Sequence, residues 1–329
     1  MAALPGEFEL IRRYFAPLAA QAPGALALQD DVCTIAPSPG HDLVLTVDAL
    51  TAGVHFLRND PPDLIARKML RVNLSDLAGK GATPLGYLMT TAFDPATDEV
   101  WVARFVEGLA LDQAEFGLAL LGGDTTATPG PMALTATLIG TVPRGRGLRR
   151  NGARPGYRLL VTGTIGDGYF GLAASRNELN NLSHAELDYL AGRYRLPQPR
   201  VAFGAALVAR GLGRAGMDVS DGLAADLAHM CEASGCGARV ATPRVPLSGA
   251  VAALLADEPD LLPAAIAGGD DYEVLLAAAP DQVPAILETA RETATPIAEI
   301  GVFTTGQDLL FLDADNRPVA LPKAGFTHF

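Results

Sequence analysis

Residues 118–126 read Leu-Ala-Leu-Leu-Gly-Gly-Asp-Thr-Thr, an apolar run followed at once by two glycines, an acid and two hydroxyl residues. The run from Leu118 to Leu121 predicts a buried strand, and the glycines predict a turn after it. In such a turn, backbone N–H groups can approach a phosphate while Asp124 reaches an attached cation. The same residues also fit an ordinary turn, so this segment indicates a phosphate site only in combination with similar segments.

Two further segments have the same character. Residues 217–223, Met-Asp-Val-Ser-Asp-Gly-Leu, open a helix with two acids around Ser220, and capping alone accounts for only one of those acids. Residues 73–76, Asn-Leu-Ser-Asp, close a predicted helix. The full set of such positions, all predicted to lie at strand ends or in glycine-containing turns, is Asp30, Asp31, Thr46, Asp48, Asp76, Asp124, Asp218 and Asp221.

These acids together predict a site for several metal ions and a phosphate. Carboxylates repel one another when they share a cleft, so a chain that gathers them normally holds divalent cations between them. Oxygen ligands without a His or Cys cluster favour magnesium over zinc. The alternative is that aspartate is simply a good turn and capping residue, which explains single positions but explains the set poorly.

Composition limits the other function classes. The chain has 329 residues, of which 49% are hydrophobic and 19% charged, so a sizeable core and two domains are expected. Its formal charge of −12 argues against a nucleic-acid partner or an anionic membrane surface. Three cysteines, Cys33, Cys231 and Cys236, and the lack of an apolar run of about 18 residues predict a cytoplasmic protein with no membrane span.

The hydrophobic periodicity predicts alternating strands and helices. Phe8, Ile11, Phe15 and Leu18 share one face of an opening helix, and a helix over 62–77 carries Arg67, Lys68 and Arg71 at polar positions. Strands are predicted over 43–48, 85–93, 118–121, 132–142, 158–162, 272–278, 297–303 and 309–312. Further helices are predicted after Thr97 and over 167–175, 201–210 and 223–233. The turn-rich residues 151–156 divide the chain into domains 1–150 and 151–329.

The common nucleotide-binding motifs are absent. The sequence contains no G-x-x-x-x-G-K-[ST], and no G-x-G-x-x-G follows a strand. Residues 163–168, Gly-Thr-Ile-Gly-Asp-Gly, come close to a phosphate-binding turn, but a tight connection between a strand and a helix fits them equally well. The basic group Arg144, Arg146, Arg149 and Arg150 fits either a solvated loop or an arm that binds a triphosphate.

Read in order, these segments resemble the thiamine-monophosphate kinase family. That family is part of the superfamily of aminoimidazole ribonucleotide synthetase, selenophosphate synthetase and a hydrogenase-maturation protein. The resemblance runs nearly end to end. It rests on 6–8 with Ile11, 30–31, 46–48, 53–56, 73–78, 122–126, 145–153, 217–223, 268–273 and 325–329.

The resemblance implies a fold, a reaction and a partner. The fold would be a two-domain α/β (α+β) arrangement, with an N-terminal mixed sheet carrying helices and a C-terminal α/β domain, and the nucleotide and metals between them. The reaction would be ATP-dependent phosphorylation of thiamine monophosphate to the diphosphate. The substrate phosphate would attack the γ-phosphorus directly and in line, with several Mg²⁺ ions and no covalent or other catalytic side chain. A homodimer built through the N-terminal sheets is also implied.

The resemblance also assigns residues. It places magnesium on Asp31, Thr46, Val47, Asp48, Asp76, Asp124, Asp218 and Asp221; ATP on Gly123, Asp124, Arg150 and Ser220; and thiamine monophosphate on His55, Asp270 and Phe326. Without the family context, His55 reads as a packed or surface histidine, and Phe326 as a residue that docks the tail.

The chain departs from the family pattern at several places. Gln29 replaces a usual glycine, Val47 a hydroxyl residue, Tyr157 an Asp, Asp270 a Glu, and Phe326 a larger aromatic. Val47 therefore has only its backbone carbonyl to offer a metal. Asp270, one methylene shorter than Glu, would reach the substrate through water.

Other members of the superfamily, and a non-catalytic metal-binding relative, are the alternatives. A selenophosphate synthetase is expected to carry a reactive cysteine near its start, whereas the first here is Cys33. The maturation protein is expected to end in cysteine, whereas this sequence ends His328-Phe329. The segment 54–56 and the closing residues give no support to a cyclo-ligase, and a protein without turnover would have little reason to retain all the acids.

Overall fold

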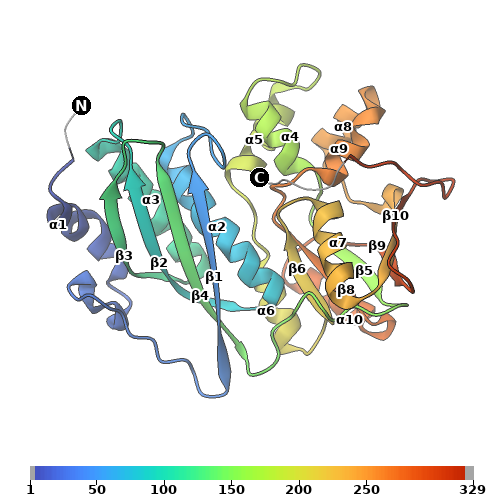
Figure 1. Ribbon diagram of the computed structural model, residues 1–329, viewed down its shortest axis with the longest axis horizontal. Coiled ribbons are helices and arrows are strands. Elements are labelled where there is room, and N and C mark those ends of the chain that lie inside the picture. Colours follow the sequence, from blue (N-terminus) through green and yellow to red (C-terminus); the bar gives the residue numbers. More distant parts are fainter. Residues whose placement is uncertain (1–3, 323–329) are drawn as a thin grey trace. The chain divides into compact units, whose positions relative to one another are not determined.

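The computed structural model describes residues 4–322 and forms two compact units (Figure 1). The first unit consists of Met1–Leu77 and Thr83–Gly145, and the second of Ala78–Ala82 and Arg146–Phe329. Residues 78–82 thus belong to the second unit, whereas the predicted division at residue 150 places them in the first domain. In the described part of the chain, no helix is both long and apolar enough to cross a membrane.

The first unit is built on a four-stranded mixed sheet. Its strands are β1 (His41–Thr51), β2 (Thr83–Phe93), β3 (Ala119–Ala127) and β4 (Ala133–Pro143), in the order β1-β4-β2-β3. Strand β4 is antiparallel to both of its neighbours, whereas β2 and β3 are parallel. All four strands coincide with predicted apolar segments; β1, β2 and β3 are longer than or extend past the predicted ranges, and β4 is displaced by one residue.

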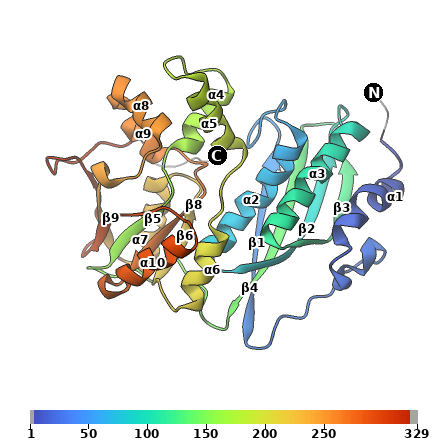
Figure 2. The ribbon, with the colours of Figure 1, turned by 180° about the vertical axis from the view of Figure 1, so that it is seen from behind.

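Two helices cover one face of this sheet, as Figure 2 shows. They are α2 (Pro62–Lys80) and α3 (Glu99–Phe116). Asp98, rather than the predicted Thr97, is the N-cap of α3: its side chain accepts a hydrogen bond from the N–H of Trp101. The ring of Trp101 stacks on Phe105 at a centroid distance of 5.1 Å, which anchors α3 to the core.

The N-terminal segment covers part of the opposite face. It contains α1 (Glu7–Leu10) and three short irregular helices, Ile11–Phe15, Ala16–Ala19 and Pro23–Leu28. Ala19 and Ala25 pack on Leu121 and Ile139 of the sheet. The chain opens helically as predicted, but Phe8 is 83% exposed, so its predicted place on the buried face is wrong. The helix changes from α to π and then 3₁₀ geometry, which rotates Phe8 out of line with Phe15 and Leu18.

Two of the basic residues predicted at polar positions of α2 are another correction. Lys68 is 2% exposed and Arg71 is 1% exposed, so neither lies on a solvated face. Both Arg67 and Arg71 bond to Asp112 of α3, which is itself fully buried. Sequence periodicity assigns a charged residue of a helix to the solvent-facing side, but such a residue can be buried where a partner of opposite charge packs against it.

The second unit contains a six-stranded sheet in the order β10-β7-β9-β5-β8-β6. The bounds are β5 (Arg158–Thr162), β6 (Ala215–Val219), β7 (Gly237–Ala241), β8 (Glu273–Ala278), β9 (Ile297–Thr304) and β10 (Leu309–Leu312). Pairing is antiparallel except between β7 and β10. The periodicity did not reveal β6 and β7, which have only five residues each; β6 is buried at every position, so it shows no polar alternation, and β7 holds only one large apolar residue, Val240.

Helices cover both faces of this sheet. Alternate residues of β5 and β8 pack with α7 (Leu223–Ser234) on one side, and with α6 (Val201–Ala209) and α10 (Val283–Glu292) on the other. A separate apolar cluster joins α4 (Asp167–Ser175), α5 (His184–Arg195), α8 (Gly249–Asp257) and α9 (Leu262–Ala267). Two α/β units, the first with a mixed sheet, confirm the predicted fold class.

Candidate active site

The structure changes the expected setting of four candidate ligands. Thr46 and Asp48 lie inside β1, Asp124 lies inside β3, and Asp76 lies inside α2. The expectation that all eight positions occupy strand ends or turns is therefore wrong for these four. The glycines that suggested a turn at 122–123 instead continue the strand, where Gly122 pairs with Leu88 and Gly123 with Met89 of β2.

Thr46 and Asp76 are brought into direct contact. The Thr46 hydroxyl donates a hydrogen bond to Asp76 Oδ2, which joins the middle of β1 to the C-terminal part of α2. Asp48 is two residues from Thr46 on the strand, so it shares the face that α2 covers. Val47 points the other way and its side chain is 59% exposed, leaving only its carbonyl as an oxygen donor.

Asp124 lies on the opposite face of the same sheet. The Thr91 and Thr125 hydroxyls are 3.3 Å apart on the face of buried Tyr87, so Asp124, which pairs with Thr90, points away from α2. An extra residue at Leu121 shifts the register between β2 and β3. Such bulges reorient the side chains that follow.

The glycine at 123 is needed by the sheet itself. A Cβ atom built on Gly123 would lie 1.8 Å from the carbonyl oxygen of Met89 on β2, so no side chain fits there. This close approach of two strands explains the glycine without a phosphate. Contact of Gly123 with ATP therefore stays a prediction.

Asp31 and His55 lie outside regular structure. Asp31, like Asp30, is exposed in the segment before β1. His55 follows β1, and its Nδ1 accepts a hydrogen bond of 3.0 Å from the N–H of Thr51. In the neutral ring the proton is therefore on Nε2, which makes this nitrogen a donor.

The second unit holds the loop between β6 and α7. Asp218 is buried at the end of β6, and Ser220 and Asp221 are half-buried in the loop. Asp226, in the first turns of α7, uses one carboxylate oxygen to accept the N–H groups of both Ser220 and Asp221 at 3.0 Å. This acid, which the sequence analysis missed, closes the loop onto the helix that follows it.

The electrostatics of Asp226 reflect its burial. The pKa of Asp226 is raised to about 7, first by burial and then by the charge of Asp221, while the N–H groups of Asp221 and Ser220 and the charge of Arg150 act in the opposite direction. Arg150 therefore lies within electrostatic range of the loop that carries Ser220, so two of the candidate ATP contacts belong to one region. An acid within the otherwise apolar helix run 223–228 was the signal that could have revealed Asp226.

The glycine-rich turn at 163–168 is structural. The N–H groups of Gly163 and Ile165 donate to the carbonyls of Pro296 and Pro246. Those of Gly166 and Gly168 donate to Asp271, at 2.8 and 3.0 Å. A buried carboxylate of this chain thus occupies the anion position at the start of α4, and the tight-connection alternative is confirmed.

Asp270 lies in the loop before β8. It has a left-handed backbone, with φ of 72°, and its carboxylate accepts a hydrogen bond of 3.1 Å from the Tyr272 hydroxyl. Phe326, the third residue assigned to the substrate, lies outside the described residues. Of these two candidate acceptor residues, only Asp270 is therefore described by the structure.

Within residues 4–322, no three His, Cys, Asp or Glu side chains are grouped closely enough to hold a metal ion. The donor set itself fits magnesium by its chemistry, because every candidate ligand offers a carboxylate, a hydroxyl or a carbonyl oxygen. In the first unit Thr46 and Asp76 are in contact, and in the second unit Asp218 and Asp221 lie three residues apart in the chain.

Comparison with known proteins identifies both halves of the chain. The N-terminal domain of AIR synthase related protein matches residues 29–142, and the C-terminal domain of AIR synthase related protein matches residues 154–311. Thiamine-monophosphate kinase of Caulobacter vibrioides is 44% identical over 330 residues, which covers 99% of this chain and 92% of the relative.

Solved structures agree with the sequence relatives. Thiamine-monophosphate kinase from Stenotrophomonas maltophilia K279a superimposes with a TM-score of 0.84 at 36% identity, covering 95% of this chain and 98% of that one. The structure of AaThiL complexed with AMPPCP and TMP gives a TM-score of 0.76 at 26% identity, covering 98% and 97%. On these matches along nearly its whole length, the chain belongs to the thiamine-monophosphate kinase family of AIR synthase related proteins.

Proposed function

We propose that this protein transfers the γ-phosphate of ATP to thiamine monophosphate and so forms thiamine diphosphate. One observation carries the proposal: the fold matches, over 98% of this chain, a structure that holds both an ATP analogue and TMP. The curated relative at 44% identity has the same named activity. These matches favour this activity over selenophosphate or aminoimidazole ribonucleotide synthesis.

The chemistry needs no general base. The acceptor is a phosphate oxyanion and is already a nucleophile, so the protein has only to align it with the γ-phosphorus and neutralise charge. Gly123, Asp124, Arg150 and Ser220 would contact ATP. His55 and Asp270, with Phe326 outside the described residues, would bind the acceptor. The ring of His55 would contact the acceptor, and its Nδ1 accepts a hydrogen bond from the N–H of Thr51.

The candidate metal ligands fit this role by their oxygen chemistry. We propose that Asp31, Thr46, the Val47 carbonyl, Asp48, Asp76, Asp124, Asp218 and Asp221 hold Mg²⁺. Bound Mg²⁺ would neutralise the polyphosphate charge that a P-loop lysine neutralises in other kinases. The contact between Thr46 and Asp76 supports a shared role for that pair.

We also propose that the protein works as a homodimer in the cytoplasm, where ATP is available. The outer face of β1 supports the dimer, because Leu43, Leu45 and Val47 are 39%, 60% and 59% exposed on alternate positions of one strand. Contiguous exposed apolar side chains on a strand normally mark an interaction surface. A second copy of the chain, packed through its own first sheet, is the proposed occupant.

The experiment is an acceptor panel with purified protein, ATP and Mg²⁺, followed by ADP release and product detection. Thiamine monophosphate should be phosphorylated, and thiamine should be a poor acceptor because its hydroxyl is neutral and needs a base. Activity should continue to rise with Mg²⁺ after all ATP is in the MgATP form. Equal transfer to thiamine, or phosphorylation of a different acceptor only, would contradict the proposal, and saturation at one Mg²⁺ per ATP would contradict the multi-metal site.

A further inference from the structure

The loop before β8 has an unusual backbone. Asp270 and Tyr272 both adopt left-handed conformations, with φ of 72° and 52°. Residues with side chains rarely adopt this conformation, and they hold it only where the surroundings impose it. The residues between and after them, Asp271 and Glu273, are 1% and 0% exposed. The loop therefore alternates two partly exposed residues with two buried acids.

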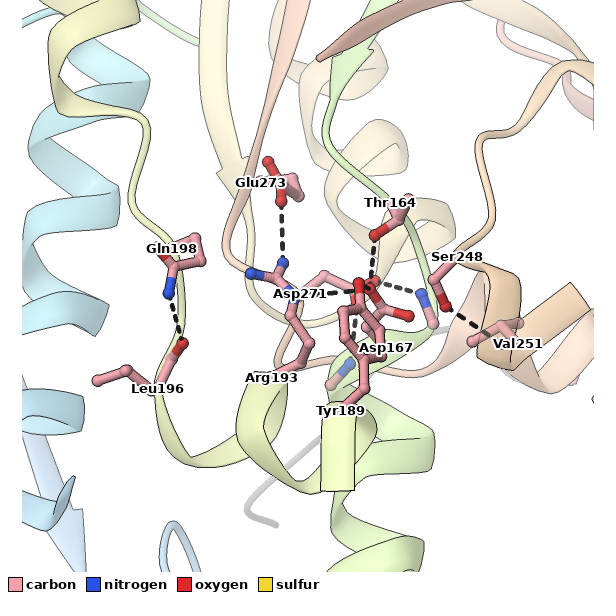
Figure 3. Close-up of polar contacts among 12 residues, drawn as sticks. Thr164, Asp167, Tyr189, Arg193, Leu196, Gln198, Ser248, Val251, Asp271 and Glu273 are labelled. Carbon is pink, nitrogen blue, oxygen red and sulfur yellow. Dashed lines mark hydrogen bonds and ion pairs between the residues drawn. The ribbon is translucent and has the colours of Figure 1, made fainter. Parts of the chain in front are cut away.

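The first buried acid, Asp271, is bonded to the start of α4. Its Oδ2 accepts the N–H of Gly166 at 2.8 Å and its Oδ1 accepts the N–H of Gly168 at 3.0 Å. Both oxygens are thus used to cap a helix that comes from a distant part of the chain. Figure 3 shows Asp271 beside Asp167 and Arg193.

The second buried acid, Glu273, fixes the other end of the loop. Arg200 binds it through Nε and Nη2 at 2.7 and 2.6 Å, and Arg193 Nη2 lies 3.0 Å away. Arg193 also faces Asp167, with Nε 3.5 Å from Oδ2, as Figure 3 shows. Buried acids with this many charged and neutral donors resist displacement, because any movement leaves a charge unpaired.

Backbone contacts complete the restraint on Asp270. Its N–H donates to the carbonyl of Ser220 at 2.8 Å, and the N–H of Tyr272 donates to the carbonyl of Val219 at 2.8 Å. On its other side, Asp270 touches Gly168: a Cβ atom on Gly168 would lie 2.1 Å from the Asp270 carbonyl oxygen. The backbone of Asp270 is thus held between the ATP-side loop and the start of α4.

We infer that Asp271 is a positioning residue for the acceptor site: by capping α4 it holds the backbone of Asp270 in the left-handed conformation that presents the Asp270 carboxylate to thiamine monophosphate. This inference rests on the proposed function for the identity of the acceptor. Asp271 itself is buried and touches backbone N–H groups rather than substrate. Its contribution is to acceptor binding through Asp270.

Two substitutions test the inference by different routes. Asp271→Asn keeps the shape but offers one acceptor oxygen to two N–H groups, so one bond to α4 is lost. Gly168→Ala leaves Asp271 intact and pushes directly on the Asp270 backbone. The matched control is Gly192→Ala on α5, where nothing lies within 4 Å of the added methyl group. Gly168→Ala keeps the inference testable if Asp271→Asn does not fold.

The kinetic measurement is the KM for each substrate. Both test variants should raise the KM for thiamine monophosphate about tenfold or more while the KM for ATP changes less than about threefold, since only acceptor alignment is disturbed. Gly192→Ala should match the wild type. Equal changes in both KM values, or no change in a folded variant, would overturn the inference.

A second measurement does not depend on turnover. Amide hydrogen exchange at Gly166 and Gly168 should be slow in the wild type and clearly faster in Asp271→Asn, and exchange at Asp270 should rise with it. Unchanged exchange would refute the cap whether or not the protein phosphorylates thiamine monophosphate. A wild type that shows protected amides but no transfer to thiamine monophosphate would instead contradict the proposed function and, with it, the acceptor role given to Asp270.

Discussion

Arg71 of α2 and Asp112 of α3 form a buried, two-point ion pair, with Nε 2.8 Å from Oδ2 and Nη2 2.9 Å from Oδ1. The side chains are 1% and 0% exposed. Arg67 and Glu115 extend the pair into a small network at its solvent edge. This network joins the two helices that cover the first sheet, and it does so with residues that sequence periodicity assigns to the surface.

Breaking this pair should destabilise the first unit strongly. Arg71→Ala leaves the Asp112 charge buried without its main partner, so the free energy of unfolding should fall by about 3–5 kcal/mol. Arg104→Ala is the control, because the pair of Arg104 with Asp63 is 51% and 29% exposed and should contribute less than about 1 kcal/mol. Urea unfolding of both variants measures the difference. Similar losses in the two variants would be inconsistent with the buried pair as the main link.

Removing a candidate metal ligand should abolish turnover and leave the fold intact. Asp76→Asn and Asp124→Asn each remove a charge that would neutralise the transferring phosphate through bound Mg²⁺. Without metal, thermal stability should hold or rise, because less negative charge remains to repel its neighbours. Asp188→Asn, at an exposed position of α5, is the control and should retain wild-type turnover. Near-wild-type rates in both test variants would refute the metal assignment.

The raised pKa of Asp226 predicts a pH dependence of stability. Its folded-state pKa of about 7 lies above the ordinary value of 3.8, so the folded protein binds the proton more tightly than the unfolded chain. Its ionisation therefore lowers stability progressively as pH rises from about 4, and the full cost is present above about pH 7. Asp226→Asn removes this cost and retains an oxygen for the Ser220 and Asp221 N–H groups.

The measurement is the difference in Tm between Asp226→Asn and the wild type in EDTA. At pH 8 the Tm of the variant should be higher, because its free energy of unfolding is larger by a few kcal/mol. The difference in Tm should shrink at pH 5, where the wild-type carboxyl is largely protonated. Comparing the two proteins at each pH cancels the titration of the other groups. A Tm difference that is the same at pH 5 and pH 8 would show that Asp226 does not titrate in this range.

His55 should act on the acceptor side. His55→Ala should raise the KM for thiamine monophosphate several-fold and change the KM for ATP little, because the family resemblance places this side chain on the acceptor. His41→Ala, at the start of β1, provides the control. Steady-state kinetics with each substrate varied in turn measures the split. A larger effect on ATP than on the acceptor would place His55 elsewhere in the mechanism.

The proposed dimer should depend on the outer face of β1. Leu45→Asp puts a charge in the middle of the exposed apolar stripe and should shift the protein from dimer to monomer in sedimentation velocity. Leu287→Asp on α10, where the side chain is 38% exposed, is the control and should not change the oligomeric state. A wild type that sediments as a monomer at high concentration would refute the dimer directly.

Local sequence determined the elements whose ends coincide with a change of residue type, such as the end of an apolar run. Strand β5 and helix α4 were predicted at their observed bounds, because the short apolar run 159–161 is followed within two residues by the glycine-rich segment 163–168, and glycines are rare inside strands. Strand β10 was likewise predicted at its observed bounds. The order of the acid-bearing segments predicted the family, since neither their order nor their spacing depends on packing. It did not predict that Gly122 and Gly123 lie within a strand, which β2 supports from one side.

Tertiary structure alone decided where the polar side chains lie. Periodicity cannot distinguish a buried arginine from an exposed one, because Arg71 is buried only by virtue of Asp112, 41 residues away. In the same way, Thr46 contacts Asp76 and Asp271 caps α4 across segments that are distant in sequence. The face on which Asp124 lies is likewise set by the pairing of β3 with β2. The physical reason is that a charged or hydrogen-bonding group may be buried only where a partner meets it, and that partner is supplied by the fold.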